Sequence, residues 1–417
     1  MRGTLASMGS GIDSARAWKV AVAAAITNGV AFGTVYTFGT FFEAMASEFG
    51  TGLGPTSVVF SITLFLFLGT GAASGFLADR YGPRPLVWVG GLLFSGGLFL
   101  TSQVDQLWHG YLTYGVGAGL GGGLFVSPLF AAVAGWFDRY RAIGQGVAAT
   151  GNGLGTLILL PLANRLIETD GWRHAYVTLA VISAVTFAIG GLLLDRPPIE
   201  RPPRAGRHLR AVLATTSFRR LAIGGALATA GQSSAFAFTV LFATDAGVSS
   251  ARAALLIGIV GASSIIGRLL LTGLSDRVGS VRMLQACLLV QPLAFFLLAI
   301  AGANYTVLVA YAVLLGLGYG GFVALIGQVS AHLFGVRGLG VVLGWVYLSA
   351  AVGSLLYPPV VGFLADATST GDVSTSIVPK LAIAGVSFVG SLYLLRLSPD
   401  PVPTETLEAT LEPAAVD

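Results

Sequence analysis

Residues 249–282 read SSARAALLIGIVGASSIIGRLLLTGLSDRVGSVR and place one arginine, Arg268, inside an otherwise apolar segment. The part from Ala251 to Leu274 is long enough to cross the hydrocarbon core of a bilayer, which is about 30 Å thick. Arg268 precedes Asp276 by eight residues, which puts it about 12 Å inside the segment. An arginine at that depth costs about 3 kcal/mol to insert. We therefore expect Arg268 to line a polar cavity; the alternative is a structural cation bound to helix carbonyls or to a neighbouring helix.

The composition agrees with a membrane protein. Of 417 residues, 54% are hydrophobic and only 10% are charged, whereas soluble domains carry about 25% charged residues. The 58 glycines lie among hydrophobic runs, and small residues allow transmembrane helices to pack closely. Short alternating segments typical of a transmembrane barrel are absent from the sequence. The sequence predicts an all-α membrane protein.

Apolar runs between polar breaks predict twelve transmembrane helices in two six-helix bundles. We place the domains at 1–194 for the N-terminal bundle, 195–217 for a linker, 218–396 for the C-terminal bundle and 397–417 for a disordered tail. The predicted spans start near Trp18, Thr56, Leu86, His109, Ala142, Trp172, Phe218, Ser250, Met283, Tyr305, Gly338 and Ser376.

The distribution of basic residues predicts the orientation, because cytoplasmic connections are enriched in Lys and Arg. An even number of spans places both termini on one side, together with the linker. Eighteen of the 23 basic residues then share that side: Arg2, Arg16, Lys19, Arg80, Arg84, Arg139, Arg141, Arg196, Arg201, Arg204, Arg207, Arg210, Arg219, Arg220, Arg277, Arg282, Arg337 and Arg396. We expect both termini, the linker and the tail to be cytoplasmic.

An internal repeat supports the division into two halves. A shift of 197 residues places Asp79, Arg80 and Gly82 on Asp276, Arg277 and Gly279. The same shift pairs Tyr114 with Tyr311, Gly119 with Gly316, Gly121 with Gly318, Gly123 with Gly320, Ala134 with Ala331, Phe137 with Phe334 and Pro161 with Pro358. Parallel repeats of this kind bind a substrate between the halves, near the middle of the bilayer.

The first copy of the repeated turn, GFLADRYGPR at residues 75–84, resembles the signature loop of the major facilitator superfamily, G-x-L-x-D-R-x-G-R-R. The one departure is Pro83. Charged side chains at such a helix end can form contacts that hold one conformation closed. We therefore predict gating roles for five residues, with simple topology signals as the alternative: Asp79, Arg80, Arg84, Asp276 and Arg277.

Several passages are similar to the monocarboxylate transporter family and the related oxalate:formate antiporters. They are NGVAFGTVYTFGTFFEAMASEFG at 28–50, GLGYGGFVALIGQVSAHLFGVRGLGVVLG at 316–344 and GSLLYPPVVGFLAD at 353–366. Together with an arginine in the eighth span, they cover both halves. The resemblance implies a major facilitator fold and makes Arg268 the residue that binds a carboxylate.

The chemistry of arginine agrees with that role, because its planar fork of donors matches both oxygens of a carboxylate. A few polar side chains should orient a small anion among apolar walls. By depth in the spans, the further candidates for substrate binding are Asn28, Tyr36, Tyr114, Asn152, Gln232, Ser264, Tyr319, Trp345 and Tyr347. Each of them alone could instead form a hydrogen bond between helices.

Two departures concern the coupling mechanism. Ser264 stands one turn before Arg268, where animal proton-coupled members of the family have an aspartate. The family's lysines in the first helix, and the antiporters' lysine in the eleventh, have no counterpart, because the chain contains only Lys19 and Lys380, near predicted helix ends. A proton could travel on the substrate carboxylate itself or involve Glu43 or Asp245.

Three function classes compete: a proton-linked transporter of small monocarboxylates such as lactate or pyruvate, an organic-anion exchanger or efflux pump of the same architecture, and a membrane enzyme or receptor. No clustered nucleophile and base lies within the spans, so we expect no enzyme. One cysteine and four scattered histidines predict no metal site and no cofactor. We expect alternating access by a monomer in the plasma membrane, with the substrate, a proton and lipid as partners and without nucleic acid.

Overall fold

The computed structural model describes residues 11–197, 206–335, 339–368 and 376–403, and these segments are helical and contain no strand. The first half of the chain forms α1 (Ala15–Tyr36), α2 (Phe38–Phe49), α3 (Leu53–Gly69), α4 (Gly71–Tyr81), α5 (Pro83–Thr101), α6 (Leu107–Gly110), a π-helix η1 (Tyr111–Ala118), α7 (Gly119–Trp136), α8 (Arg141–Asp170) and α9 (Trp172–Leu193). The second half forms α10 (Gly206–Ala214), α11 (Thr216–Asp245), α12 (Ser250–Val278), α13 (Ser280–Ala301), α14 (Tyr305–Phe334), α15 (Leu339–Thr368) and α16 (Val378–Leu394).

These helices fit the twelve predicted spans. Within the described segments, ten helical stretches are long and apolar enough to cross a membrane, and the two shorter apolar helices are α3 and α16. Some spans are composite: α1 and α2 together form one stretch, as do α6, η1 and α7. Eleven predicted starts lie within three residues of a helix start; the other, Gly338, lies outside the described residues.

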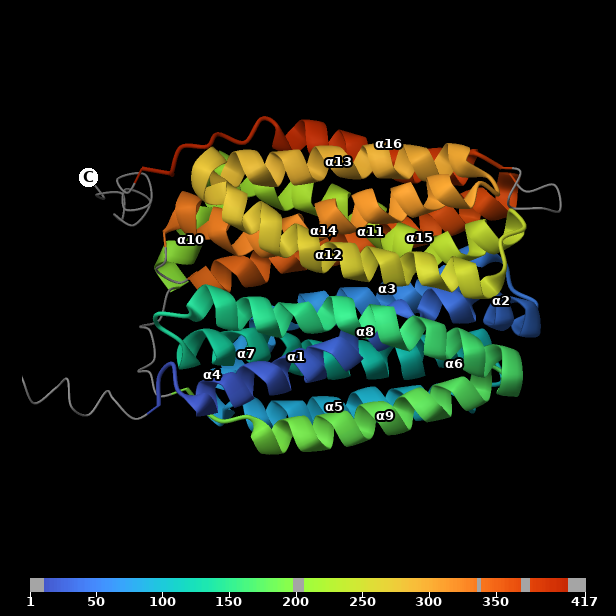
Figure 1. Cartoon of the computed structure of the whole chain (residues 1–417), viewed down its shortest axis with the longest axis horizontal. Coiled ribbons are helices and arrows are strands. Elements are labelled where there is room, and N and C mark those ends of the chain that lie inside the picture. The colour runs from blue at the N-terminus through green and yellow to red at the C-terminus, as the bar shows by residue number, and fades with distance from the viewer. Residues whose placement is uncertain (1–10, 198–205, 336–338, 369–375, 404–417) are drawn as a thin grey trace, which may run out of the picture.

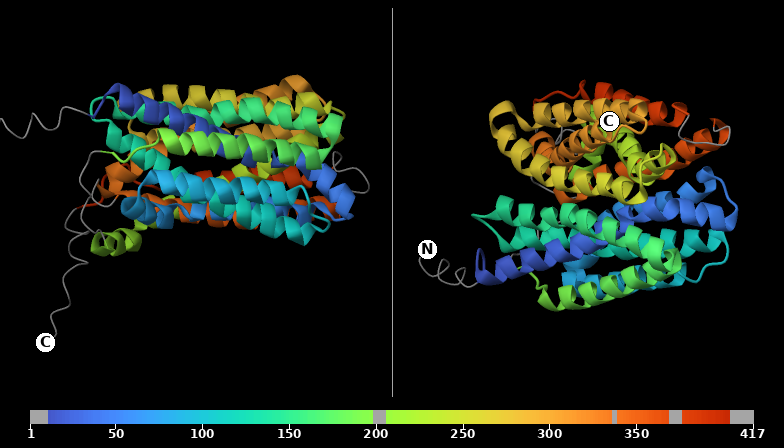
Figure 2. Two further views of the ribbon diagram at one scale, coloured as in Figure 1. Left: turned by 90° about the horizontal axis from the view of Figure 1, so that it is seen from below. Right: turned by 45° about the vertical axis from the view of Figure 1, so that its right-hand side comes forward.

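The helices form two bundles that lie side by side (Figure 1). Helices α1–α9 make up one bundle and α11–α16 the other, and the right-hand view in Figure 2 shows the same separation. We call the end where α1 begins and α16 ends the terminal face, and the opposite end, where α8 ends and α12 begins, the distal face. The exact domain boundaries stay a prediction.

The repeat of 197 residues is visible in the packing. A Cβ atom added to Gly119 would lie 2.9 Å from the carbonyl oxygen of Thr63. One added to Gly316 would lie 2.5 Å from the carbonyl oxygen of Val260, and both members of this second pair are 197 residues later. Gly121 with Gly90 and Gly318 with Cys287 form a second such set, at 2.6 Å and 2.8 Å. The two halves therefore pack equivalent helices through equivalent backbone contacts.

Glycine also brings α1 and α8 together. A Cβ atom on Gly151 would overlap the backbone of Ala25, and one on Gly155 would overlap the backbone of Gly29. Apolar lipid supplies little hydrophobic force between helices, so close van der Waals contact at small residues has to hold them together. This crossing fixes the faces of α1 and α8 that point toward the centre of the molecule.

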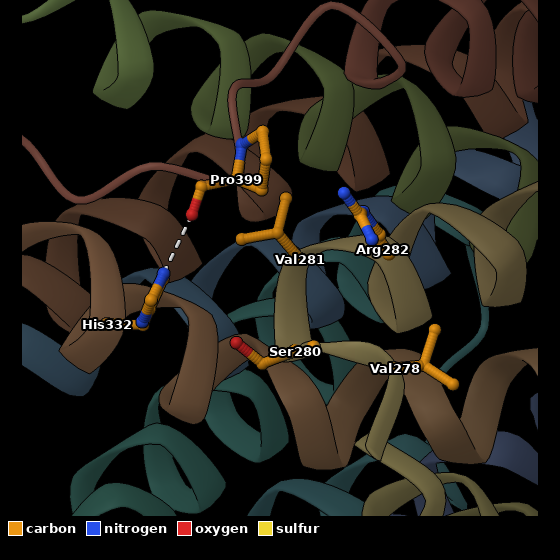
Figure 3. Close-up of a pocket in the computed structure, with 7 residues that line it drawn as sticks. Val278, Ser280, Val281, Arg282, His332 and Pro399 are labelled. Carbon is orange, nitrogen blue, oxygen red and sulfur yellow. Dashed lines mark hydrogen bonds between the residues drawn. The ribbon is translucent and has the colours of Figure 1, made fainter. Parts of the chain in front are cut away.

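Two connecting segments contain more structure than predicted. The linker contains α10, whose Ala211 and Val212 are buried against the second bundle; residues 198–205 lie outside the described part. The expectation of a disordered tail is wrong for its first residues. Leu397 is buried, and Figure 3 shows Pro399, whose carbonyl oxygen accepts a hydrogen bond from His332 Nε2 at 2.7 Å. Residues 404–417 lie outside the described part.

We predict that Gly155→Ala destabilises the protein by about 1–3 kcal/mol, because the new methyl group must push α1 away from α8. Gly146→Ala is the matched control in the same helix, since a Cβ atom there meets nothing within 4 Å. The control should leave the stability unchanged or raise it slightly, because alanine favours a helix over glycine. Thermal unfolding of the purified variants in detergent measures both. Equal melting temperatures for the two variants would contradict the packing argument.

Candidate functional site

Arg268 joins the two halves at the centre of the molecule. Its side chain is 6% exposed, and its Nη1 donates a hydrogen bond to the carbonyl oxygen of Ala149 on α8. The approach of α12 to α8 depends on glycine, because a Cβ atom on Gly153 would lie 2.5 Å from the carbonyl oxygen of Gly261. A backbone carbonyl of one half therefore partly satisfies the buried cation of the other.

The rest of the Arg268 guanidinium has no hydrogen-bond partner among the described residues. Nε and Nη2 are both buried and unpartnered. These two nitrogens form one edge of the guanidinium plane, and their parallel N–H groups are spaced for the two oxygens of a carboxylate. Because a buried donor without a partner is costly, this edge is prepared to receive an acceptor.

Three tyrosines from three helices lie within electrostatic reach of this charge. Tyr319 on α14, Tyr36 on α1 and Tyr347 on α15 all interact electrostatically with Arg268. The hydroxyl groups of Tyr36 and Tyr319 lie 3.1 Å apart in a hydrogen bond between the halves. Phe236 on α11 stacks on Tyr36, with ring centroids 4.1 Å apart, and packs edge-on against Tyr319 at 5.4 Å. These rings form an aromatic contact between the two bundles.

Two asparagines add buried amide groups near the crossing of α1 and α8. Asn28 precedes Gly29 on α1 and Asn152 follows Gly151 on α8, so the close contact of those glycines directs both side chains to the same side of two parallel helices. Both amide atoms of Asn28 and Oδ1 of Asn152 are buried and have no hydrogen-bond partner in the part of the chain that the structure describes. Unsatisfied buried polar atoms are rare in proteins and indicate a polar ligand or water.

The comparisons with known proteins agree with this architecture. A sequence profile described as Major Facilitator Superfamily matches residues 24–291 and 221–416. Monocarboxylate transporter 3 of Rattus norvegicus is 31% identical over 407 residues, which cover 94% of this chain and 83% of the relative. Monocarboxylate transporter 11 of Homo sapiens is 30% identical over 390 residues, or 90% of this chain and 83% of that protein.

The chain belongs to the Major Facilitator Superfamily, within its monocarboxylate transporter family. It is a multi-pass membrane transporter and not an enzyme. Solved structures show the same fold. A point mutant of the nucleoside transporter NupG has a TM-score of 0.74 at 13% identity and covers 92% of this chain and 99% of its own. A bacterial homologue of the human lysosomal transporter Spinster, described as inward-facing and occupied, has a TM-score of 0.72 at 15% identity and covers 90% and 95%.

Four of the predicted binding residues are bonded to other groups or exposed. Gln232 Nε2 donates to Gln291 Oε1 at 2.8 Å, and the Tyr114 hydroxyl donates to backbone carbonyls of α1 at 3.3 Å. Ser264 Oγ donates to the carbonyl of Gly261 in its own helix at 2.7 Å. The Trp345 side chain is 41% exposed. For the first three, the structure shows the structural hydrogen bonds that the sequence left open as the alternative.

Of the predicted gating residues in the signature loop, Arg80 and Arg84 contact their own half. Arg84 donates to the carboxylate of Asp195 at 3.1 Å, and Arg16 donates to the same carboxylate at 2.7 Å. The carbonyl oxygen of Arg80 accepts a hydrogen bond from Arg196 at 2.9 Å. This network ties the start of α1 and of α5 to the end of α9 within the first bundle. Arg277 is exposed, and the side chains of Asp79 and Asp276 lie outside what the structure describes.

Sequence reasoning missed three participants in these contacts. The predicted linker begins at Asp195, although an acidic residue among arginines could have indicated an ion pair. Phe236 is one of many apolar residues in the spans, and nothing in the sequence distinguishes it from the others. The carbonyl of Ala149 carries no side-chain signal at all. Glu43 is exposed on α2 and Asp245 is half-buried at the end of α11, so their proton-carrying roles stay predictions.

We predict that Tyr36 and Tyr319 are energetically coupled. Each single change to Phe should destabilise the protein by about 1 kcal/mol, because the remaining hydroxyl loses its buried partner. The double variant Tyr36→Phe with Tyr319→Phe should lose less than the sum, since no hydroxyl is then left unpaired. A double-mutant cycle on thermal unfolding measures the coupling. Strict additivity would show that the hydrogen bond between the halves contributes nothing.

Proposed function

We propose that the protein is a secondary active transporter that moves a small monocarboxylate, of the lactate or pyruvate type, by alternating access. The unpartnered edge of Arg268 carries this proposal, because Nε and Nη2 are placed as a bidentate carboxylate ligand. The names of the monocarboxylate transporter relatives support the same substrate class. A carboxylate supplies both acceptors that this buried edge lacks.

The surrounding polar groups would orient the rest of the substrate. The hydroxyls of Tyr36, Tyr319 and Tyr347 offer donors and acceptors within electrostatic reach of the charge. The amide of Asn28 and Oδ1 of Asn152 have no hydrogen-bond partner among the described residues. A small acid with a second polar group, such as a 2-hydroxy or 2-oxo acid, uses both features. The stacked rings of Tyr36 and Phe236 supply an apolar wall.

The position of Arg268 supports alternating access. In this structure its Nη1 contacts a carbonyl of the opposite half, so movement of α12 away from α8 removes a partner from the guanidinium. A bound carboxylate would compensate for that loss and make separation of the helices less costly. We place the transporter in the plasma membrane with both termini cytoplasmic, on the basis of its Arg-rich terminal face.

The decisive variant is Arg268→Lys, which keeps the positive charge but removes the planar fork. We expect the KM for monocarboxylate uptake to rise by about tenfold to a hundredfold, because one of two charge-assisted hydrogen bonds is lost. Uptake of labelled lactate and pyruvate into proteoliposomes measures it. Arg252→Lys is the matched control: Arg252 lies over the ring of Tyr305 near the distal face, with 5.6 Å from Cζ to the centroid. Unchanged uptake by Arg268→Lys would contradict the assigned role.

Proton coupling is the second part of the proposal, with anion exchange as its rival. Position 264, one turn before Arg268, is a serine and not an acid, and its Oγ is bonded within its own helix. The proposal therefore lets the substrate carboxylate itself carry the proton. We expect an inward proton gradient to drive uptake into liposomes that contain no internal anion, since a protonated substrate needs no exchange partner. Uptake that requires preloading with a second carboxylate would instead establish exchange.

A further inference from the structure

We propose that Asp366 is a latch that closes the distal face by joining α15 of the second half to the start of α3 in the first half. Its Oδ1 accepts a hydrogen bond from the backbone N–H of Leu53 at 2.8 Å. Its Oδ2 accepts one from the N–H of Gly54 at 2.9 Å. One carboxylate from one bundle therefore holds two backbone groups of the other.

The contact provides hydrogen-bond acceptors for the first N–H groups of α3. The first N–H groups of a helix have no partner within the helix, and the helix dipole favours a negative charge there. The N-cap residue of α3 is Gly52, which has no side chain and makes no capping hydrogen bond. Asp366 supplies the cap from the opposite bundle. Separation of the halves at this face removes the cap from α3.

Small residues allow this approach. A Cβ atom on Gly362 would lie 2.8 Å from Cα of Gly54, and one on Gly52 would lie 2.5 Å from Oδ2 of Asp366. The ring of Phe363 occupies the space where a side chain on Gly54 would lie. The end of α15 and the start of α3 therefore pack closely over a full helical turn. Asp366 is part of this packed contact and is not an isolated surface charge.

The sequence repeats the elements of this contact in an inverted arrangement. The pentapeptide Gly-Phe-Leu-Ala-Asp occurs at residues 75–79 and again at 362–366, and Gly-Leu-Gly occurs at 52–54 and at 338–340. The span formed by α3 and α4 packs side by side with α15, and the two run in opposite directions. Each span therefore begins with the tripeptide and ends with the pentapeptide. Such a match along an antiparallel pair indicates a specific helix contact.

Further contacts between the halves lie on the distal side of Arg268. Phe42 on α2 packs against Phe238 on α11, with ring centroids 5.0 Å apart. Leu157 on α8 lies 3.3 Å from a Cβ position at Gly258 on α12. The structure is thus closed at its distal side. Opening that side requires the Asp366 carboxylate to leave α3, which makes Asp366 a positioning residue in the conformational equilibrium.

The inference rests on the proposed alternating access but not on the identity of the substrate, so the test uses the purified, reconstituted full chain without any substrate. Spin labels at Thr169 and Ala303, which are exposed at the distal face of opposite halves, report the opening in a Cys287→Ser background. Double electron–electron resonance gives the distance distribution. Asp366→Asn should raise the ratio of the long-distance to the short-distance population by about tenfold, because a neutral amide can accept with only one of its two polar atoms.

Gly362→Ala is the second variant, because its methyl group wedges α15 away from Gly54 while favouring the helix itself. It should also increase the long-distance population. Gly385→Ala on α16 of the same half is the matched control, since a Cβ atom there meets nothing within 4 Å. Asp105→Asn controls for the loss of one exposed charge near the distal face. Both controls should keep the wild-type distribution.

Three results would overturn the proposal. They are an unchanged distribution in Asp366→Asn, a shift in Gly362→Ala without one in Asp366→Asn, and equal shifts in the two controls. Because no substrate is present, loss of the latch is distinguished from an error in the proposed transport activity. Failure of monocarboxylate uptake with an intact Asp366 effect would reject the substrate and retain the latch.

Discussion

The close approach of helix backbones at glycine is the constraint on which the rest of this structure depends. In a bilayer, apolar side chains gain little by leaving lipid for protein, so helices associate where backbones can touch. Gly153 and Gly261 bring α8 to α12, and through this contact the carbonyl of Ala149 comes within reach of Arg268. Gly362 and Gly54 play the same part for α15 and α3. The polar contacts between the halves follow from the glycine contacts.

The charges are distributed unequally over this symmetrical scaffold. Equivalent glycines 197 residues apart make equivalent contacts, yet the position equivalent to Arg268 is Gly71. The first half has its own exposed ion pairs at the terminal face, where Asp195 binds Arg16 and Arg84. The second half supplies the buried central cation, Arg268, and the carboxylate of Asp366, which contacts the first half at the distal face. The duplicated frame is therefore symmetrical in its packing, whereas Arg268 has no counterpart at the equivalent position.

Around Arg268, the sequence predicted the kinds of side chain better than their directions. Tyr36, Tyr319 and Tyr347 interact electrostatically with Arg268, whereas at comparable depths Gln232 bonds to Gln291 and Trp345 is exposed. Depth follows from counting residues along a helix, because each residue adds a fixed rise. The direction in which a side chain points around the helix axis cannot be counted in this way. A helix that is apolar on all sides has no polar stripe to mark which face is outside. Direction is therefore set only when neighbouring helices pack.

The sequence by itself determined the spans, the two halves, the register of the repeat and the need of one buried arginine for partners. Hydropathy, periodicity and the cost of burying charge are properties of the residues and survive without a fold. Only the tertiary structure decided that a backbone carbonyl meets Nη1 of Arg268 while Nε and Nη2 remain open, and that Asp366 caps a helix of the opposite half. Backbone N–H and C=O groups are the same at nearly every residue. No sequence pattern therefore predicts which of them will form a hydrogen bond with a side chain of the other half.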